Sequence, residues 1–77
     1  MAENIFLENI AEILEVEKES ISFETDFRND VEEWDSLKGF GMIVFFEDEC
    51  NKVVTVEEFL KAKTIGDLYK LIQWGGG

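Results

Sequence analysis

Near the N-terminus, apolar side chains recur at the spacing of a helix. Between Asn4 and Val16 they stand three or four positions apart, with glutamates between them, and this pattern predicts an amphipathic helix. The next segment, Glu17 to Asp35, has no regular period, but it contains several large apolar residues among polar ones. We therefore expect a long loop that apolar anchors hold against the core. Loops of this length usually serve a function.

A second helix is predicted over Ser36 to Cys50, because Asp35 is a suitable N-cap residue immediately before it. The apolar residues of this segment fall into two stripes at helical spacing, and each stripe is compatible with burial in the core. One helix of a thin domain rarely buries its full circumference, so part of this apolar surface is expected to meet partners. The first stripe comprises Leu37, Phe40 and Val44, and the second comprises Ile43, Phe46 and Cys50.

The same segment also has features of β-structure. Met42–Phe46 and Lys52–Val56 are short apolar runs, and such runs do not distinguish a strand from a buried helix. Gly39 and Gly41 favour strands, because each glycine costs a helix interior about 1 kcal/mol relative to alanine. On pattern alone, both interpretations stay open.

Two tetrapeptides in the C-terminal third have the form of helix starts. Thr55-Val56-Glu57-Glu58 is a capping box, in which the threonine and the glutamate bind each other's backbone N–H groups. Thr64-Ile65-Gly66-Asp67 repeats the arrangement with aspartate in place of glutamate. We expect a short third helix and then a fourth, whose apolar stripe is Ile65, Leu68, Leu71 and Ile72. Gly75-Gly76-Gly77 is expected to form a flexible tail after a single domain, residues 1–74.

The composition indicates a folded, acidic domain. The 77-residue chain is 45% hydrophobic with seven Phe and two Trp, which is too apolar for a disordered chain despite a formal charge of −11. The acidic excess disfavours nucleic acid and anionic membranes as partners and favours basic protein surfaces. No apolar run approaches the ~20 residues that span a bilayer, and no secretory signal is apparent. We expect a cytoplasmic monomer.

Residue types that most catalysis requires are scarce. The chain has no histidine and a single cysteine, Cys50, so the usual general bases and nucleophile pairs cannot be assembled, and zinc ligands are scarce. Cys50 cannot form an internal disulfide, and it is expected to be a small core residue. The run Asp26 to Leu37 superficially suggests a calcium loop, but Val31 replaces the required glycine and Leu37 the terminal glutamate. We expect neither enzymatic activity nor a metal site.

The tetrapeptide Trp34-Asp35-Ser36-Leu37 resembles the motif that opens the second helix of acyl carrier proteins. In that family the serine of an Asp-Ser-Leu motif is esterified by 4'-phosphopantetheine taken from coenzyme A, and Ser36 occupies this position. Glu47-Asp48-Glu49 is similar to the acidic end of the family's second helix. Thr64-Ile65-Gly66-Asp67-Leu68 is similar to the start of its last helix, and the resemblance spans roughly Ile5 to Ile72.

The resemblance implies an all-α fold: a small four-helix bundle with a long loop between helices 1 and 2 and a short third helix. It therefore favours helix over strand for the second segment. It also implies a carrier rather than an enzyme. The thiol of the arm holds acyl intermediates as thioesters between enzymes of fatty-acid, polyketide or related biosynthesis, and a phosphopantetheinyl transferase supplies the base and metal for modification.

The expected partners are this transferase and acyl-transferring and condensing enzymes with basic surfaces, because acids like Glu47 and Asp48 pair with such surfaces in the family. The residues expected to recognise partners are Asp35, Leu37, Phe40, Val44, Glu47 and Asp48. Some of these positions and their neighbours depart from the commonest pattern. Housekeeping fatty-acid carriers usually have acids in place of Lys38 and Gly41, a smaller aliphatic residue in place of Phe40, and Met in place of Val44. A specialised pathway is therefore as compatible with the sequence as central fatty-acid synthesis.

Two other classes of protein stay open on the sequence. A ubiquitin-like modifier is suggested by the C-terminal glycines and by the strand interpretation of Met42 to Val56. An unmodified acidic helical adaptor that binds a basic partner is the second alternative.

Overall fold

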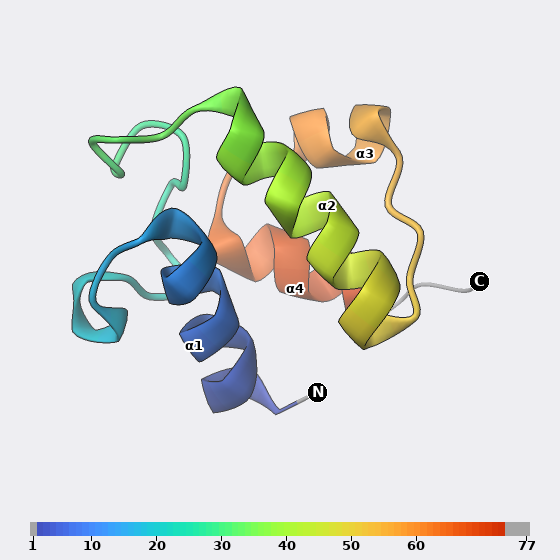
Figure 1. Ribbon diagram of the computed structural model, residues 1–77, viewed down its shortest axis with the longest axis horizontal. Coiled ribbons are helices and arrows are strands. Elements are labelled where there is room, and N and C mark those ends of the chain that lie inside the picture. The colour runs from blue at the N-terminus through green and yellow to red at the C-terminus, as the bar shows by residue number, and fades with distance from the viewer. Residues whose placement is uncertain (1, 74–77) are drawn as a thin grey trace.

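The computed structural model describes residues 2–73, which form α-helices and one short 3-10 helix (Figure 1). Within this range the predicted all-α fold is confirmed, because the only β-type pairing is an isolated bridge between Asp26 and Thr64. The predicted end of the domain at residue 74 and the glycine tail lie outside the described residues. In chain order the elements are α1 (Glu3–Leu14), η1 (Lys18–Ser20), α2 (Ser36–Cys50), α3 (Val56–Lys61) and α4 (Ile65–Gln73).

Helix α1 is two residues shorter at its C-terminus than the sequence pattern predicted. The backbone of Glu15 turns into the left-handed region (φ 60°), and the N–H of Val16 then bonds the carbonyl oxygen of Ala11 at 3.0 Å. This geometry satisfies carbonyl groups that the last helical turn leaves without a partner. Val16 still packs partly against the core. The apolar spacing along the sequence therefore extends past the last residue of the helix.

Helix α2 has the predicted bounds, and the strand interpretation of Met42–Phe46 is wrong. The helix ends at Cys50, and the C-cap residue Asn51 adopts φ 54°, a left-handed conformation that asparagine tolerates better than most residues. The second supposed strand, Lys52–Val56, is an extended connection that leads into the first residue of α3. Of its three valines, Val54 is buried in the core, whereas Val53 and Val56 are exposed.

The capping boxes predicted for α3 and α4 are both present. The Thr55 hydroxyl accepts a hydrogen bond from the N–H of Glu58 (3.1 Å), and the Glu58 carboxylate accepts one from the N–H of Thr55 (3.0 Å). Thr64 and Asp67 exchange the same pair of bonds at 3.1 and 3.0 Å, and Asp67 also accepts from the N–H of Lys63. These backbone donors lower the pKa of the Glu58 and Asp67 carboxyls.

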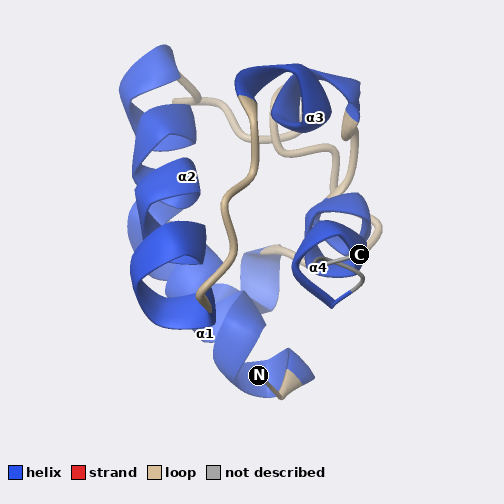
Figure 2. Ribbon diagram, turned by 90° about the vertical axis from the view of Figure 1, so that its right-hand side faces the viewer, coloured by secondary structure: helices blue, strands red, loops and turns tan. Residues whose placement is uncertain are grey.

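Phe6 lies at the centre of the main core and joins α1, α2 and α4. Its side chain is fully buried, and its ring centroid lies 4.9 Å from that of Tyr69 and 6.1 Å from that of Phe46. Figure 2 shows α2 and α4 on opposite sides of the molecule, with α3 at one end. None of the helices within residues 2–73 has the length and apolarity needed to cross a membrane.

A second aromatic cluster fastens the long loop to the helices. Phe27 is fully buried, and its ring centroid lies 5.3 Å from that of Trp34 and 5.4 Å from that of Phe59 in α3. Val31 is also buried. The expectation of a loop held by apolar anchors is therefore confirmed. This cluster fixes the position of the end of the loop, where α2 begins.

Candidate functional site

Ser36 is the first residue of α2, at the point where the long loop ends. The preceding residue, Asp35, is extended (φ −149°, ψ 173°), and its carboxylate accepts a 2.9 Å hydrogen bond from the N–H of Lys38. This confirms the predicted N-cap. The Lys38 ammonium in turn donates a 2.8 Å bond to the carbonyl oxygen of Glu33. Loop and helix are thus joined on both sides of Ser36, whose side chain is exposed.

The hydroxyl of Ser36 differs from every other serine and threonine hydroxyl of the chain. The chain has six such residues, all within residues 2–73. Five of them use the hydroxyl in a local hydrogen bond that shapes the loop or caps a helix, whereas Ser36 makes none with any described residue. Its hydroxyl is therefore both exposed and uncommitted. The five others are Ser20, Ser22, Thr25, Thr55 and Thr64.

The surroundings of Ser36 fit a phosphodiester. In the first turn of an α-helix the leading N–H groups have no acceptor within the helix, and the helix dipole places partial positive charge there. Both features favour an anion. The first turn of α2 contains no acidic residue, and the Asp35 carboxylate is engaged by the N–H of Lys38. A phosphate ester on the Ser36 oxygen would meet backbone donors rather than an unpaired carboxylate.

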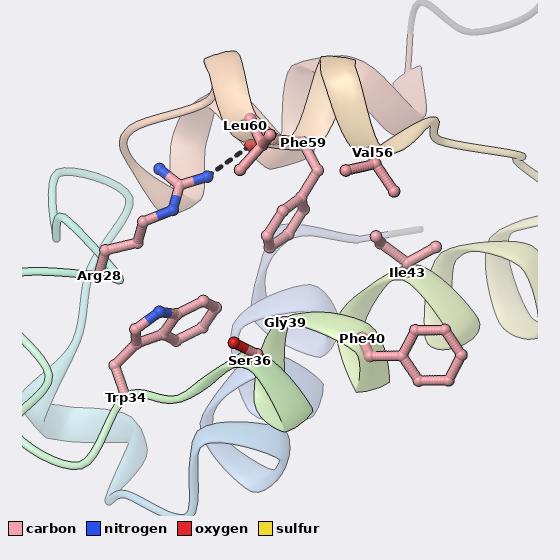
Figure 3. A pocket seen from close by; sticks show the side chains of 9 residues that line it. All are labelled: Arg28, Trp34, Ser36, Gly39, Phe40, Ile43, Val56, Phe59 and Leu60. Carbon is pink, nitrogen blue, oxygen red and sulfur yellow. Dashed lines mark hydrogen bonds between the residues drawn. The ribbon is translucent and has the colours of Figure 1, made fainter.

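A groove of about 310 Å³ lies between α2 and α3 and begins at Ser36 (Figure 3). We call it the α2–α3 groove. The Arg28 guanidinium, the Ser36 hydroxyl and the Trp34 indole N–H are the polar groups among the lining side chains, and the other lining residues are apolar or glycine. Because Ser36 itself lines the groove, a flexible group attached to Ser36 can reach it directly. The lining residues are Arg28, Trp34, Ser36, Gly39, Phe40, Ile43, Val56, Phe59 and Leu60.

Gly39 has a packing role that the sequence did not reveal. It is buried in α2, and a Cβ atom at this position would lie 3.1 Å from the Trp34 ring and 3.3 Å from the Phe59 ring. Few Cβ atoms make contacts this short, so an alanine would displace at least one ring. The glycine that favoured a strand in the sequence pattern instead lets two aromatic rings meet against the backbone of a helix.

Arg28 holds the C-terminal end of α3, and the sequence analysis missed it. Its two terminal nitrogens donate 2.7 Å hydrogen bonds to the carbonyl oxygens of Phe59 and Ala62. A positive charge at the C-terminus of a helix is also electrostatically favourable. With the Thr55 and Glu58 box at the other end, both ends of this six-residue helix are fixed. The available signal was a lone arginine in an acidic loop, directly after an apolar anchor.

The first stripe of α2 is exposed, which excludes the core interpretation for these residues. Leu37, Phe40 and Val44 are 79%, 65% and 39% exposed, while Asp35, Glu47 and Asp48 are exposed around them. The buried residues of α2 are Gly39, Met42, Phe45 and Phe46. The residues expected to recognise partners thus share the outer surface of α2. We call Leu37, Phe40 and Val44 the exposed strip.

Helix α3 extends this exposed apolar surface in a way that the sequence analysis missed. Val56 and Leu60 are 64% and 63% exposed, and both line the α2–α3 groove opposite Phe40 and Ile43 (Figure 3). The sequence pattern placed Val56 in a possible strand and in the capping box, and it did not single out Leu60. Their spacing of four residues was the available signal, because it places them on one face.

Other predicted features lie away from this site. Cys50 is half-buried against the core, and burial raises the pKa of its thiol. In the segment that resembles a calcium loop, Asp26 accepts hydrogen bonds from the side chain and backbone of Asn29 and from the backbone of Arg28, which lowers the pKa of its carboxyl. Over residues 2–73, no group of three or more His, Cys, Asp or Glu residues is arranged to hold a metal ion.

Comparison with known proteins agrees with the geometry. Residues 4–72 match the family model described as phosphopantetheine attachment site, which places the chain among domains that bear this arm. The acyl carrier protein of Lactobacillus acidophilus is 38% identical over 64 residues, covering 83% of this chain and 79% of the relative. The chain belongs to the acyl carrier protein family. Its cofactor is a covalently attached 4'-phosphopantetheine, and it is a carrier rather than an enzyme. The sheet-rich fold of a ubiquitin-like modifier is absent from residues 2–73.

Proposed function

We propose that Ser36 is the residue that bears the phosphopantetheine arm. The observation that carries this proposal is its hydroxyl, which is exposed, free of hydrogen bonds to residues 2–73, and located at the capped start of α2. In the modification, the Ser36 oxygen attacks the phosphorus atom of coenzyme A that bears pantetheine. A phosphoester bond forms, the pyrophosphate linkage breaks, and adenosine 3',5'-bisphosphate leaves. The transferase supplies the base that takes the hydroxyl proton.

We further propose that the arm carries acyl groups as thioesters between enzymes of fatty-acid, polyketide or related biosynthesis. The α2–α3 groove supports this role, because it begins at Ser36 and is walled mainly by apolar side chains. An apolar acyl group folded back from the arm would lose contact with water there. A groove that only shelters the acyl group requires no catalytic side chain, because the partner enzymes carry out the reactions. This agrees with a chain that lacks histidine.

The recognition surface that we propose combines the exposed strip with the acids around it, Asp35, Glu47 and Asp48. Exposed apolar side chains supply contact area at an interface, and surrounding charges steer partners of opposite charge. Phosphopantetheinyl transferases and acyl-transferring or condensing enzymes with basic surfaces are the partners that fit this surface. Asp35 has a second task in the fold, since its carboxylate caps α2.

The test of Ser36 is its replacement by alanine. Wild type and Ser36→Ala are incubated with coenzyme A and a promiscuous phosphopantetheinyl transferase, and the intact proteins are weighed. We expect wild type to gain the mass of one arm and Ser36→Ala to gain none. The variant should stay folded, because Asp35 still caps α2, and circular dichroism checks this.

Ser22→Ala is the matched control, because Ser22 is also exposed but lies in the long loop. It should gain one arm, as wild type does. A Ser36→Ala protein that still gained an arm would assign the modification to another residue. If wild type gained none with several transferases, the proposal would be wrong and the acidic adaptor would become the better hypothesis.

A further inference from the structure

We propose that Trp34 limits the length of the acyl group that the α2–α3 groove shelters. The inference rests on the proposed function, because the occupant is an acyl group on the arm at Ser36. Ser36 lines the groove, so this occupant is tethered at its edge. Trp34 also lines the groove, and it stands two residues before the attachment point, at the end of the groove that faces the long loop (Figure 3).

Three residues close this end of the groove. The rings of Trp34 and Phe59 lie nearly parallel, with an interplanar angle of 20° and centroids 6.3 Å apart. The edges of both rings converge on Gly39, since a Cβ built there would lie 3.1 Å from Trp34 and 3.3 Å from Phe59. The two rings and the backbone of α2 therefore leave no room for an alkyl chain to pass between them.

The Trp34 wall is also supported from behind. Fully buried Phe27 meets the Trp34 ring edge-on, with centroids 5.3 Å apart. The Arg28 guanidinium carbon lies 4.7 Å from the Phe27 ring centroid, and the two hydrogen bonds of Arg28 hold α3, and with it Phe59, in place. Close-packed groups of this kind do not yield without cost. An acyl chain that meets Trp34 must therefore stop or leave the groove.

This geometry makes shelter depend on chain length in a specific way. Each methylene that enters the groove shifts the equilibrium between sheltered and solvent-exposed acyl group by roughly fourfold, from the transfer free energy of one methylene. Carbons that would lie beyond the Trp34 ring stay in water and add nothing to the free energy that favours the sheltered state. The fraction of acyl groups that lie in the groove should therefore rise with chain length and then level off. Replacing the indole of Trp34 by a leucine side chain opens the groove towards Phe27, so the levelling should come at a longer acyl group.

The experiment uses the full-length protein loaded with a series of straight-chain acyl groups, from butyryl to tetradecanoyl. The transferase moves each acyl-phosphopantetheine from its coenzyme A thioester to the protein, and intact mass verifies loading. Two quantities are then measured for each length: the rate at which hydroxylamine cleaves the thioester, and the thermal midpoint of unfolding. In wild type we expect cleavage to slow and the midpoint to rise up to a limiting length. In Trp34→Leu both should level off at a longer chain.

Phe23→Leu is the matched control, because Phe23 is another half-buried loop aromatic, packed against Phe6 and Tyr69 away from the groove. It should lower the midpoint for all lengths and leave the limiting length unchanged. Trp34→Phe, which makes a smaller change, is the test variant if Trp34→Leu does not fold. Its limiting length should also exceed that of wild type.

Equal limiting lengths in wild type and the folded Trp34 variant would overturn the inference, and so would cleavage rates that do not depend on chain length. Those results would leave the proposed function standing, since the arm and acyl group are seen directly by mass. Failure of any arm to attach at Ser36 would instead overturn the proposed function, and the inference with it.

Discussion

Arg28 contacts Phe59 in two ways: its Nη2 atom donates a 2.7 Å hydrogen bond to the Phe59 carbonyl oxygen, and its guanidinium carbon lies 5.4 Å from the Phe59 ring centroid. The first contact holds the backbone at the end of α3, and the second covers a ring that lines the α2–α3 groove. A loop residue 31 positions earlier in the chain therefore fixes one wall of the groove.

We expect Arg28→Lys to lower the free energy of unfolding by about 1.5–3 kcal/mol, the range for a lost hydrogen bond to a charged group. Lysine keeps the positive charge but cannot donate to two carbonyl oxygens from a planar fork. Urea denaturation measures the change. Lys70→Arg, an exchange of the same residue types at an exposed position, is the control and should be nearly neutral. An Arg28→Lys protein as stable as wild type would show that charge alone holds α3.

The two glycines in the first half of α2 should respond to alanine in opposite directions. At Gly41 a Cβ would lie 3.6 Å from the Ile13 side chain, an ordinary contact, so Gly41→Ala should stabilise the domain by up to about 1 kcal/mol. At Gly39 the same atom would crowd Trp34 and Phe59, which Phe27 supports from behind. We expect Gly39→Ala to destabilise by about 1–2 kcal/mol despite its higher helix propensity.

Thermal and urea unfolding of both glycine variants measure the difference. A stabilised Gly39→Ala protein would mean that the Trp34 ring moves aside freely, and it would contradict the rigid packing described for this cluster. A stabilised Gly41→Ala protein should also deliver acyl groups more slowly, if mobility of the first turns of α2 helps the arm to leave the groove.

Asp67 should make stability depend on pH in the acid range. Hydrogen bonds from the N–H groups of Lys63 and Thr64 hold the pKa of its carboxyl below the ordinary value of 3.8. Because the folded pKa lies below the unfolded one, this group adds stability above about pH 4, and the contribution is lost as the pH falls through the folded pKa. Denaturation as a function of pH should show this loss.

Asp67→Asn keeps an oxygen acceptor but removes the titration. We expect it to be less stable than wild type at neutral pH and to lose less stability between about pH 4 and pH 2. Glu8→Gln, at an exposed position of α1, controls for the change of one charge. Parallel pH profiles for wild type and Asp67→Asn would show that the two hydrogen bonds do not distinguish the charged from the neutral carboxyl.

Charge reversal near the end of α2 should slow association with condensing enzymes. Glu47→Lys with Asp48→Lys changes the charge beside the exposed strip, and added salt should weaken association of the wild type for the same electrostatic reason. Glu8→Lys with Glu12→Lys makes the same change in net charge on α1 and should slow association less. Association rates that respond neither to salt nor to the position of the reversed charges would leave the exposed strip as the recognition element.

Local hydrogen bonding explains why several features could be predicted from sequence. The N-cap at Asp35 and the boxes at Thr55 and Thr64 each depend on groups three residues apart. Such short-range contacts form wherever the chain places these residue types, so the starts of α2, α3 and α4 agree with the pattern. The end of α1 was predicted too late, because Val16 is partly buried through a turn rather than through a continuing helix.

The sequence by itself determined the starts of the last three helices and the acidic surface, because each depends on neighbouring residues or on composition. The preference for helix over Ser36 to Cys50 and the choice of Ser36 as the candidate attachment residue came from the resemblance to acyl carrier proteins. Tertiary structure alone decided which face of α2 is buried. Met42 and Phe45, which belong to neither predicted stripe, are buried together with Phe46, because the rest of the core packs against that face. Tertiary structure also decided the roles of Trp34, Gly39 and Arg28. Each of the three has a partner in α3 or at its C-terminal end, 20 to 34 positions away, and no local pattern specifies contacts between segments so far apart in the chain.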